Sequence, residues 1–227
     1  MKAVVILSGG QDSTTCLYWA LMKYEEVTAV TFDYGQRHGV EVDAAKDIAR
    51  IAGVPWRFVS LGHILGGTSP LVDRSRQVGT YASADKLPGG IEDTFVPGRN
   101  ILFLTLAAAM ASTEREGDED VVLVTGVCEE DFGGYPDCRS GFIEAMGRAL
   151  AEGLGHGVII ATPLMHKTKA ETVQLALDLE GCYDALAHSH TCYQGQTPPC
   201  GKCHACLLRA KGFAEAGVAD PLLERFA

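Results

Sequence analysis

The segment from Val4 to Leu21, VVILSGGQDSTTCLYWAL, passes from an unbroken apolar run through two glycines into a helical pattern. A short run of Val, Ile and Leu without charge is typical of a strand that is buried on both faces of a parallel sheet. After the glycines, apolar residues recur at helical spacing, and Thr14 and Thr15 stand near the expected helix start. The segment therefore predicts a strand, a glycine turn and a helix.

The glycine turn predicts a phosphate site. Gly9 and Gly10 allow backbone conformations that other residues avoid, and they let a ligand approach the main chain closely. The amides of the turn and of the first helical turn then point outward, with the positive end of the helix dipole behind them. Asp12 would repel phosphate unless Mg²⁺ lay between them, and Mg²⁺ binds one or two carboxylates together with phosphate oxygens. A plain tight turn is the alternative.

Two better-known phosphate motifs do not occur in this sequence. The stretch from Gly195 to Lys202 imitates the Walker pattern GxxxxGK[ST], but its spacing is off by one and Cys203 follows the lysine. The glycines at 153, 155 and 157 precede a strand-like run instead of following one, so we interpret them as a flexible loop and not as a Rossmann GxGxxG motif. What remains is the pattern SGGxDS, from Ser8 to Ser13.

Apolar runs and helical patterns alternate along the rest of the chain. Strands are expected at 27–33, 56–61, 121–127 and 158–162, and helices at 11–24, 39–53, 99–116, 140–154, 168–180 and 204–216. The alternation predicts an α/β fold: a Rossmann-like parallel sheet flanked by helices on both faces, with ligands outside the carboxyl ends of the strands. Residues 62–98, rich in Gly, Ser and Pro, are expected to form a long loop or lid, or else a short hairpin.

Composition narrows the classes of partner. The chain has 227 residues, which suits one α/β domain with room for a small appendage. Its net charge of −10 disfavours a basic face for RNA, although a local basic patch is compatible with it. The first apolar run is too short for the core of a signal peptide, and no stretch approaches the ~18 apolar residues of a membrane span. We therefore expect a cytoplasmic protein without direct nucleic-acid or membrane partners.

Four of the eight cysteines gather near the C-terminus, at Cys192, Cys200, Cys203 and Cys206. In a cytosolic protein such a group favours metal binding over disulfides, and four soft thiolates suit a closed, structural tetrahedral zinc site. Unliganded thiols and an iron–sulfur cluster are the alternatives. Three nearby histidines would be needed only if one cysteine were not a ligand: His188, His190 and His204. We expect residues 1–185 to form the nucleotide-binding domain and residues 186–227 a helical zinc-binding segment packed on it.

Six segments resemble, in order, the motifs of the 7-cyano-7-deazaguanine synthase family. They are SGGQDSTTCL, FDYGQRH, VPGRN, DFGGYPDCR, TPLMHKTKAET, and CYQG followed by CGKCHACLLRAKGF, and the similarity runs from about residue 3 to residue 213. The phosphate loop alone resembles the whole ATP-pyrophosphatase superfamily, with its adenine nucleotide alpha hydrolase-like fold. The order of all six motifs makes the match to the one family specific.

The resemblance implies a ligase activity. Members of this family use ATP to convert 7-carboxy-7-deazaguanine and ammonia to the nitrile, on the route to the tRNA base queuosine and related deazapurines. This implies adenylation of the carboxylate, amide formation, and a second ATP-driven activation that dehydrates the amide. We expect ATP and Mg²⁺ at the phosphate loop, one structural Zn²⁺ and a homodimer. Because the chain has no length for a glutaminase domain, ammonia is expected to arrive free.

The resemblance also implies site residues by position. The ATP segment comprises Leu7, Ser8, Gly9, Gly10, Gln11, Asp12, Ser13, Thr14, Thr15, Cys16 and Leu17. The residues expected to be catalytic are Asp12, Ser13, Arg99 and Lys167, and those expected to bind the deazaguanine acid are Arg99, Asp131, Tyr135 and Asp137.

The chemistry of these side chains is compatible with such roles. Arg99 can form a bidentate pair with a carboxylate or a phosphate. Either Asp131 or Asp137 could accept hydrogen bonds from an exocyclic amine and a ring NH, and Tyr135 or Phe132 could stack on the ring. A structural role stays open for each of these residues, since GGYPD is also typical of a turn.

Other polar residues of the same loops are open to two interpretations. Lys167 and Lys169 could meet negative charge that develops on the α-phosphate, or they could belong to a solvated face. Thr14 could donate to phosphate or simply start the helix. Arg37 and His38 follow a strand end and are weaker candidates, because an ordinary exposed or hydrogen-bonded histidine is the default.

Two other functions compete with the ligase. A tRNA thiolase or a lysidine-type ligase would share the loop, but it would need an RNA-binding extension and a basic face, and this sequence shows neither. A zinc-bearing, nucleotide-binding regulator without turnover is the alternative from a different class. ATP consumption that depends on the deazaguanine acid would separate the ligase from the regulator.

Overall fold

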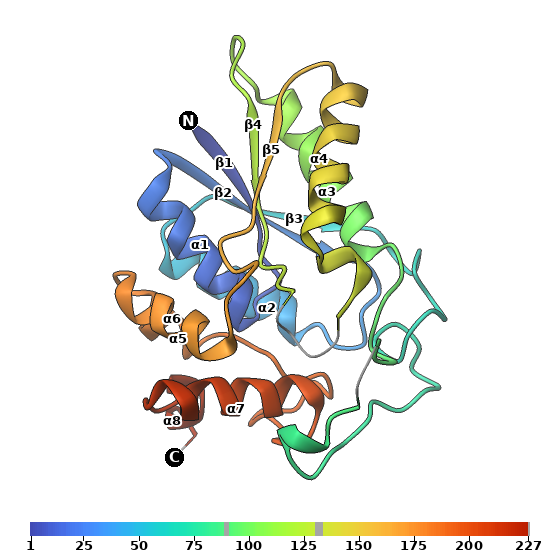
Figure 1. The fold of residues 1–227 in the computed structure, drawn as a ribbon, viewed down its shortest axis with the longest axis vertical. Helices are drawn as coiled ribbons and strands as arrows, with labels where there is room; N and C mark the ends of the chain where they lie inside the picture. Colours follow the sequence, from blue (N-terminus) through green and yellow to red (C-terminus); the bar gives the residue numbers. More distant parts are fainter. Residues whose placement is uncertain (89–90, 130–133, 227) are drawn as a thin grey trace.

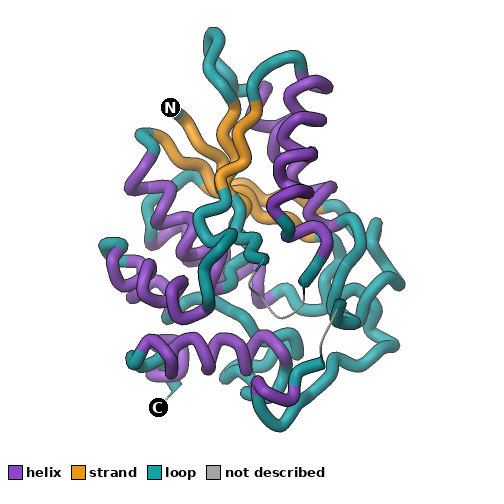
Figure 2. Tube along the Cα trace, in the orientation of Figure 1, coloured by secondary structure: helices purple, strands orange, loops and turns teal. Residues whose placement is uncertain are grey.

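The computed structural model describes residues 1–88, 91–129 and 134–226. Its centre is a sheet of five parallel strands in the order β3-β2-β1-β4-β5 (Figures 1 and 2). The strands are β1 (Lys2–Ile6), β2 (Glu26–Asp33), β3 (Trp56–Ser60), β4 (Val121–Val124) and β5 (Val158–Ala161). The parallel α/β sheet that the sequence predicts is confirmed.

The strand order reverses at β1. The chain moves from β1 to β2 and β3 on one side and then returns past β1 to β4 and β5 on the other. Ile6 of β1 pairs with Val30 of β2, and Val5 pairs with Val124 of β4. Because the connections after β1 and β4 leave toward opposite sides, a crevice forms at the carboxyl ends of these strands, which is where open α/β sheets bind ligands.

Different helices cover the two faces of the sheet (Figure 1). The first face carries α1 (Gln11–Lys23) and α2 (Val40–Ile51), and the second carries α3 (Arg99–Thr113) and α4 (Ser140–Leu154). Strand β1 contributes to both cores: Ala3 and Val5 pack on the first face, and Val4 and Ile6 on the second. Burial on both faces explains why the N-terminal run is apolar throughout.

The C-terminal helices form a further layer beside α1 (Figure 1). They are α5 (Lys169–Asp178), α6 (Cys182–Leu186), α7 (His204–Ala216) and α8 (Pro221–Glu224). Tyr18 of α1, Val173 of α5 and Phe213 of α7 share one buried cluster. Arg209 of α7 is buried and donates to Asp220, the residue before α8, from Nε at 2.7 Å and from Nη2 at 2.8 Å. This bidentate pair holds α8 against α7.

The expected elements agree with the structure to within a few residues, and helices 140–154 and 204–216 match it at both ends. The expected strand 121–127 ends earlier, at Val124, because Gly126 packs against α1: a Cβ atom there would lie 3.1 Å from the main-chain carbon of Asp12. Sequence patterns did not predict α6, α8 or the single 3₁₀ turns at Ala84–Lys86 and Pro136–Cys138. Such segments are too short to show helical periodicity.

The long segment at 62–98 is a loop in its described part. Residues 62–88 and 91–98 contain one 3₁₀ turn and no strand, so the loop is confirmed there and the hairpin alternative is wrong. The expected division of the chain at residue 185 stays a prediction.

Candidate active site and metal centre

The loop between β1 and α1 is held in shape by its own hydroxyl groups. The Ser8 amide donates to Ser13 Oγ at 3.2 Å, and Ser13 Oγ donates to the Gly10 carbonyl at 3.2 Å. Thr14 Oγ1 donates to the same carbonyl at 2.7 Å. Since the first amides of a helix have no partner within it, this fixed loop can present the amides of α1 to an anion.

Gly9 is required by what packs behind the loop. Its φ is +86°, in the left-handed region that favours glycine. A Cβ atom at this position would meet the carbonyl oxygen of Glu41 and would lie 2.8 Å from the nitrogen of Ala45, both in α2. The Gly9 carbonyl accepts from the His190 amide at 2.8 Å. The loop is therefore fixed between α2 and the segment that leads to the cysteines.

Asp12, in the first turn of α1, contacts the first residue of α5. Lys169 Nζ donates to Asp12 Oδ2 at 2.6 Å. The other carboxylate oxygen, Oδ1, is buried and has no hydrogen-bond partner among the described residues. Leaving a buried carboxylate oxygen unpaired is costly, so Asp12 fits a site in which Oδ1 binds a cation such as Mg²⁺.

A cavity of about 270 Å³ lies at the carboxyl ends of β1 and β4. Thr125 and Gly126 border it after β4, Tyr34 borders it after β2, and Arg99 borders it from the first residue of α3. The C-terminal segment contributes His190, Thr191, Tyr193, His204, Ala205, Leu208 and Arg209. One cavity thus reaches from the glycine loop to the cysteine segment.

The expected ATP segment divides into two groups. The residues that line the cavity are Leu7, Ser8, Gly10, Gln11, Asp12 and Ser13. The residues that are buried behind the loop are Gly9, Thr14, Thr15, Cys16 and Leu17. The buried residues therefore affect the cavity only by holding the lining residues in position.

Two residues expected to bind the acid border the cavity: Arg99 and Tyr135. The Tyr135 ring stacks on Phe95 with 5.3 Å between ring centres, and its hydroxyl lies 2.8 Å from Thr94 Oγ1. Burial raises the pKa of the Tyr135 hydroxyl to about 12, so Tyr135 is neutral at physiological pH. Its ring edge and hydroxyl are therefore fixed by residues of the 62–98 loop.

Neither of the two expected aspartates is among the described residues that line the cavity. Asp137 is buried and does not line the cavity; its Oδ2 accepts from the Asn100 amide at 3.3 Å. Burial raises the pKa of the Asp137 carboxyl, and the charge of Arg99 opposes this rise. Asp131, and with it Phe132, lies outside the described residues.

The lysines two residues apart are placed differently. Lys169 lines the cavity, whereas Lys167 does not. The Lys167 amide donates to the Leu164 carbonyl at 3.0 Å, and its own carbonyl accepts from the Cys128 thiol at 3.1 Å. Lys167 therefore shapes the loop before α5, and Lys169 is the lysine beside the phosphate loop.

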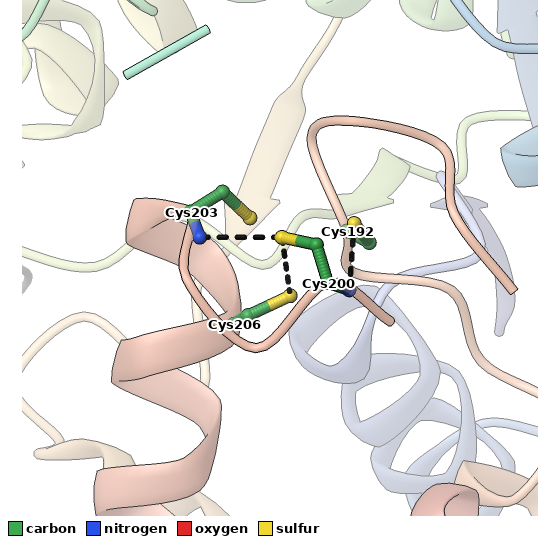
Figure 3. A group of neighbouring side chains, drawn as sticks. All are labelled: Cys192, Cys200, Cys203 and Cys206. Atoms are coloured by element: carbon green, nitrogen blue, oxygen red, sulfur yellow. Dashed lines mark hydrogen bonds between the residues drawn. The ribbon is translucent and has the colours of Figure 1, made fainter. Parts of the chain in front are cut away.

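The four C-terminal cysteines form one cluster (Figure 3). The four Sγ atoms of Cys192, Cys200, Cys203 and Cys206 all lie within 4.8 Å of one another, and those of Cys200 and Cys206 are 4.0 Å apart. Zinc–sulfur bonds of ~2.3 Å place the ligands of a tetrahedral site about 3.8 Å apart. The Cys203 amide donates to Cys200 Sγ at 3.3 Å, and the Cys200 amide donates to Cys192 Sγ at 3.4 Å. These contacts suit thiolates, so the cluster fits zinc.

Histidine ligands are not needed in this cluster. His204 Nδ1 lies 2.8 Å from Glu92 Oε2, and both side chains are almost fully buried. Thr94 Oγ1 donates to the same Glu92 oxygen at 3.0 Å and also contacts the Tyr135 hydroxyl. His190 Nε2 lies 3.1 Å from the Cys192 carbonyl oxygen. The cysteine segment is thereby connected through Glu92 to Tyr135 in the cavity.

Comparison with known proteins assigns the chain to a family. The family described as "Queuosine biosynthesis protein QueC" matches residues 2–217. The chain belongs to the QueC family. Two relatives are named 7-cyano-7-deazaguanine synthase. The relative from Gloeobacter violaceus is 54% identical over 227 residues, covering 97% of this chain and 95% of its own length. The relative from Chromobacterium violaceum is 53% identical over 228 residues, covering 99% of this chain and 94% of its own length.

A solved structure described as a predicted subunit of tRNA methyltransferase from Methanocaldococcus jannaschii is also similar to this QueC-family chain. The match has a TM-score of 0.48 and 19% identity, over 78% of this chain and 76% of the other. This likeness is too weak to add to the family assignment. In the described part of the chain, every helix is too short or too polar to span a bilayer.

The residues of this cavity that sequence patterns did not single out include Tyr34, Glu41 and Tyr193. Burial raises the pKa of the Glu41 carboxyl to about 7, against the opposing charge of Arg99. In the sequence, Glu41 is one of two acidic residues in the first turn of an amphipathic helix, together with Asp43. Its one distinguishing signal is that it stands two residues after the loop DYGQRHG, which follows a strand's carboxyl end.

Proposed function

We propose that the chain is a 7-cyano-7-deazaguanine synthase, a ligase that forms C–N bonds with the energy of ATP. The observation that carries the proposal is that a phosphate loop and Arg99 border the same cavity, in a chain more than half identical over nearly its whole length to proteins of that name. An adenylating enzyme needs this juxtaposition, because the carboxylate must reach the α-phosphate.

At the ATP end, the loop from Ser8 to Ser13 would hold the phosphates through its amides, with the dipole of α1 behind them. Asp12 would hold Mg²⁺ through Oδ1, and the ion would supply charge to neutralise the phosphate oxygens. Lys169 lies where it can meet charge that develops on the α-phosphate, and Lys167 is retained as a weaker candidate for the same role. Ser13 would act mainly by fixing the loop.

At the acid end, Arg99 would pair with the carboxylate of 7-carboxy-7-deazaguanine, and Tyr135 would contact the flat ring. Asp131 stays the candidate for the exocyclic amine. Asp137 can contribute directly only if its carboxylate leaves the Asn100 amide, so we assign it a positioning role at the start of α3.

These residues support two rounds of the same activation. The acid oxygen attacks the α-phosphate and releases pyrophosphate; ammonia then displaces AMP from the adenylate and gives the amide. The amide oxygen attacks the α-phosphate of a second ATP and releases a second pyrophosphate, and loss of AMP with two protons then gives the nitrile. Arg99 orients the acid, and Lys169 and the loop amides stabilise the charge on the phosphates in each round.

The cysteine cluster would hold one structural Zn²⁺ that folds the segment 186–227 onto the domain 1–185. Four thiolates leave the metal no open position for substrate. A homodimer in the cytoplasm, acting on small molecules without direct contact to RNA, completes the proposal.

Mass spectrometry tests the proposed function. The protein is incubated with ATP, Mg²⁺, ammonium and 7-carboxy-7-deazaguanine, and the products are weighed. We expect the amide to appear transiently and the nitrile to accumulate. Failure to consume ATP in the presence of the acid would contradict the ligase and would favour the regulator without turnover.

A further inference from the structure

Glu41 lies where the phosphate loop, the acid-binding end and the cysteine segment meet. It stands in the first turn of α2, and its carbonyl oxygen packs directly behind Gly9. Its side chain borders the cavity, as do those of Arg99 from α3 and Tyr193 from the cysteine segment. The Glu41 carboxyl therefore borders the cavity that, under the proposed function, would hold the adenylated acid.

Glu41 belongs to a small cluster of interacting charges in this cavity. Burial raises the pKa of the Glu41 carboxyl, and the charge of Arg99 opposes this rise. The charge of Cys192 adds a smaller rise to the same pKa. Burial raises the pKa of the neighbouring tyrosines, Tyr34 and Tyr193, so both are neutral near pH 7. The other charged or titratable residues of the cavity lining are Asp12, Cys128, Tyr135, Cys138, Lys169, His190, His204 and Arg209.

Among these groups, Glu41 is suited to accept a proton near neutrality. Burial raises its pKa to about 7, and a general base works best when its pKa lies near the operating pH. Burial lowers the pKa of His190, which leaves that ring a weaker acceptor. Asp12 is paired with Lys169 and faces the phosphate side.

The reaction needs an acceptor at three points. Ammonium must lose a proton before its nitrogen can attack the adenylate, and the protonated amide first formed must lose another. After the amide oxygen has attacked the second ATP, the nitrogen must shed both remaining protons as the C–O bond to AMP breaks and the C≡N bond forms. Adenylation of the acid itself releases pyrophosphate and needs no acceptor.

We propose that the Glu41 carboxylate is the proton acceptor for amide formation and for dehydration of the amide to the nitrile, after which it returns each proton to solvent. This inference rests on the proposed function and adds a catalytic residue to it.

The test starts from the amide, because this removes the ionisation of ammonia from the pH profile. Nitrile formation from the amide and ATP is followed for the wild type and for Glu41→Gln. We expect the wild-type rate to fall below about pH 7, and the variant to be about 100-fold slower and flat with pH. Glu41→Asp keeps a carboxylate, so it should form the nitrile more slowly than the wild type but should still lose rate at low pH (the acid limb of the profile).

Adenylation provides the internal control for folding. Pyrophosphate release from 7-carboxy-7-deazaguanine and ATP in a single turnover should change by less than about 3-fold in Glu41→Gln, since that step transfers no proton. Asp43→Asn removes a carboxylate of the same charge from an exposed position two residues further along α2, and it should leave both rates and the pH profile as in the wild type.

A wild-type nitrile rate or an unchanged acid limb in Glu41→Gln would overturn the inference, and so would an equal loss in adenylation, which would make Glu41 structural. If the wild type itself forms no nitrile from either substrate, the proposed function fails instead.

Discussion

The phosphate loop and the cysteine segment border the same cavity, yet different forces hold them. The loop from Ser8 to Ser13 is fixed by hydrogen bonds within five residues and by the close approach of Gly9 to α2. The segment from Cys192 to Cys206 is irregular up to α7, and its buried cluster consists mainly of the cysteines themselves. Local hydrogen bonds of the Ser13 hydroxyl and the close packing of Gly9 specify the first region, whereas the second depends on four side chains meeting at one point.

This difference predicts how substitutions in each region should affect the protein. A change in the loop should affect a local conformation and the groups that it presents. A change in the cluster should remove the tertiary structure of a whole segment, because metal binding there is folding free energy. The His190 amide, two residues before Cys192, donates to the Gly9 carbonyl and so connects the two regions.

The largest effect is expected from Cys203→Ser. Structural zinc contributes about 10 to 16 kcal/mol in small peptides near neutral pH, so loss of one thiolate should release the metal and make the chain protease-sensitive after about residue 185. Contacts to ATP at the phosphate loop should survive in part. Metal analysis and limited proteolysis measure both results.

Cys182→Ser is the matched control for that variant, since Cys182 is a buried thiol outside the cluster and should not alter the metal content. One zinc retained in Cys203→Ser with an unchanged digestion pattern would remove Cys203 from the ligand set.

Gly9→Ala should lower the free energy of unfolding by about 3 kcal/mol, from left-handed strain and the clash with α2. Gly10→Ala is its control: the backbone there is extended, and a Cβ atom would lie 3.6 Å from Ser8 Oγ, an ordinary contact. Urea unfolding of both variants distinguishes them. Equal stability would show that the packing behind Gly9 does not define the loop.

Asp12→Asn should keep the fold and slow turnover by about 10- to 100-fold, because a neutral amide oxygen binds Mg²⁺ less tightly than a carboxylate. Titration of activity with Mg²⁺ should show a weaker half-saturation. A wild-type rate with the wild-type Mg²⁺ requirement would exclude Asp12 from the metal site.

The smallest effect concerns stability as a function of pH. Because burial raises the pKa of Glu41 from 4.5 to about 7, the folded state favours its protonated form, and the carboxyl becomes progressively destabilising as pH rises from 4.5 to about 7. Glu41→Gln should therefore be more stable than the wild type at pH 8, by on the order of 1 kcal/mol, and this advantage should be smaller at pH 5. Thermal melting at the two pH values checks this. A difference in stability that does not change between pH 5 and pH 8 would mean that Glu41 is ionised throughout.

The sequence predicts the sheet and the glycine loop well because short, contiguous sequence patterns specify both. The run Val4 to Leu7, the glycines after it and the helical spacing that follows are contiguous, and their structure depends little on distant residues. The cysteine cluster is also predictable, because soft ligands at short spacing have few other uses.

The far side of the cavity is harder to predict because tertiary packing decides it. Lys167 and Lys169 stand in the same loop motif, and only the path of the chain before α5 brings Lys169 to Asp12. Asp137 looks available in a turn but is buried against Asn100. Glu41 looks like an ordinary helix-start residue, and its role follows from what α2 packs against.

The most direct test of the account follows oxygen atoms from the acid. 7-Carboxy-7-deazaguanine labelled with ¹⁸O in both carboxylate positions is converted with unlabelled ATP and ammonium, and the nucleotide products are analysed by mass spectrometry. Each round of adenylation transfers one carboxylate oxygen to AMP, so we expect both labels in AMP and none in pyrophosphate or water. ADP as the nucleotide product, or label in inorganic phosphate, would contradict adenylation at this phosphate loop.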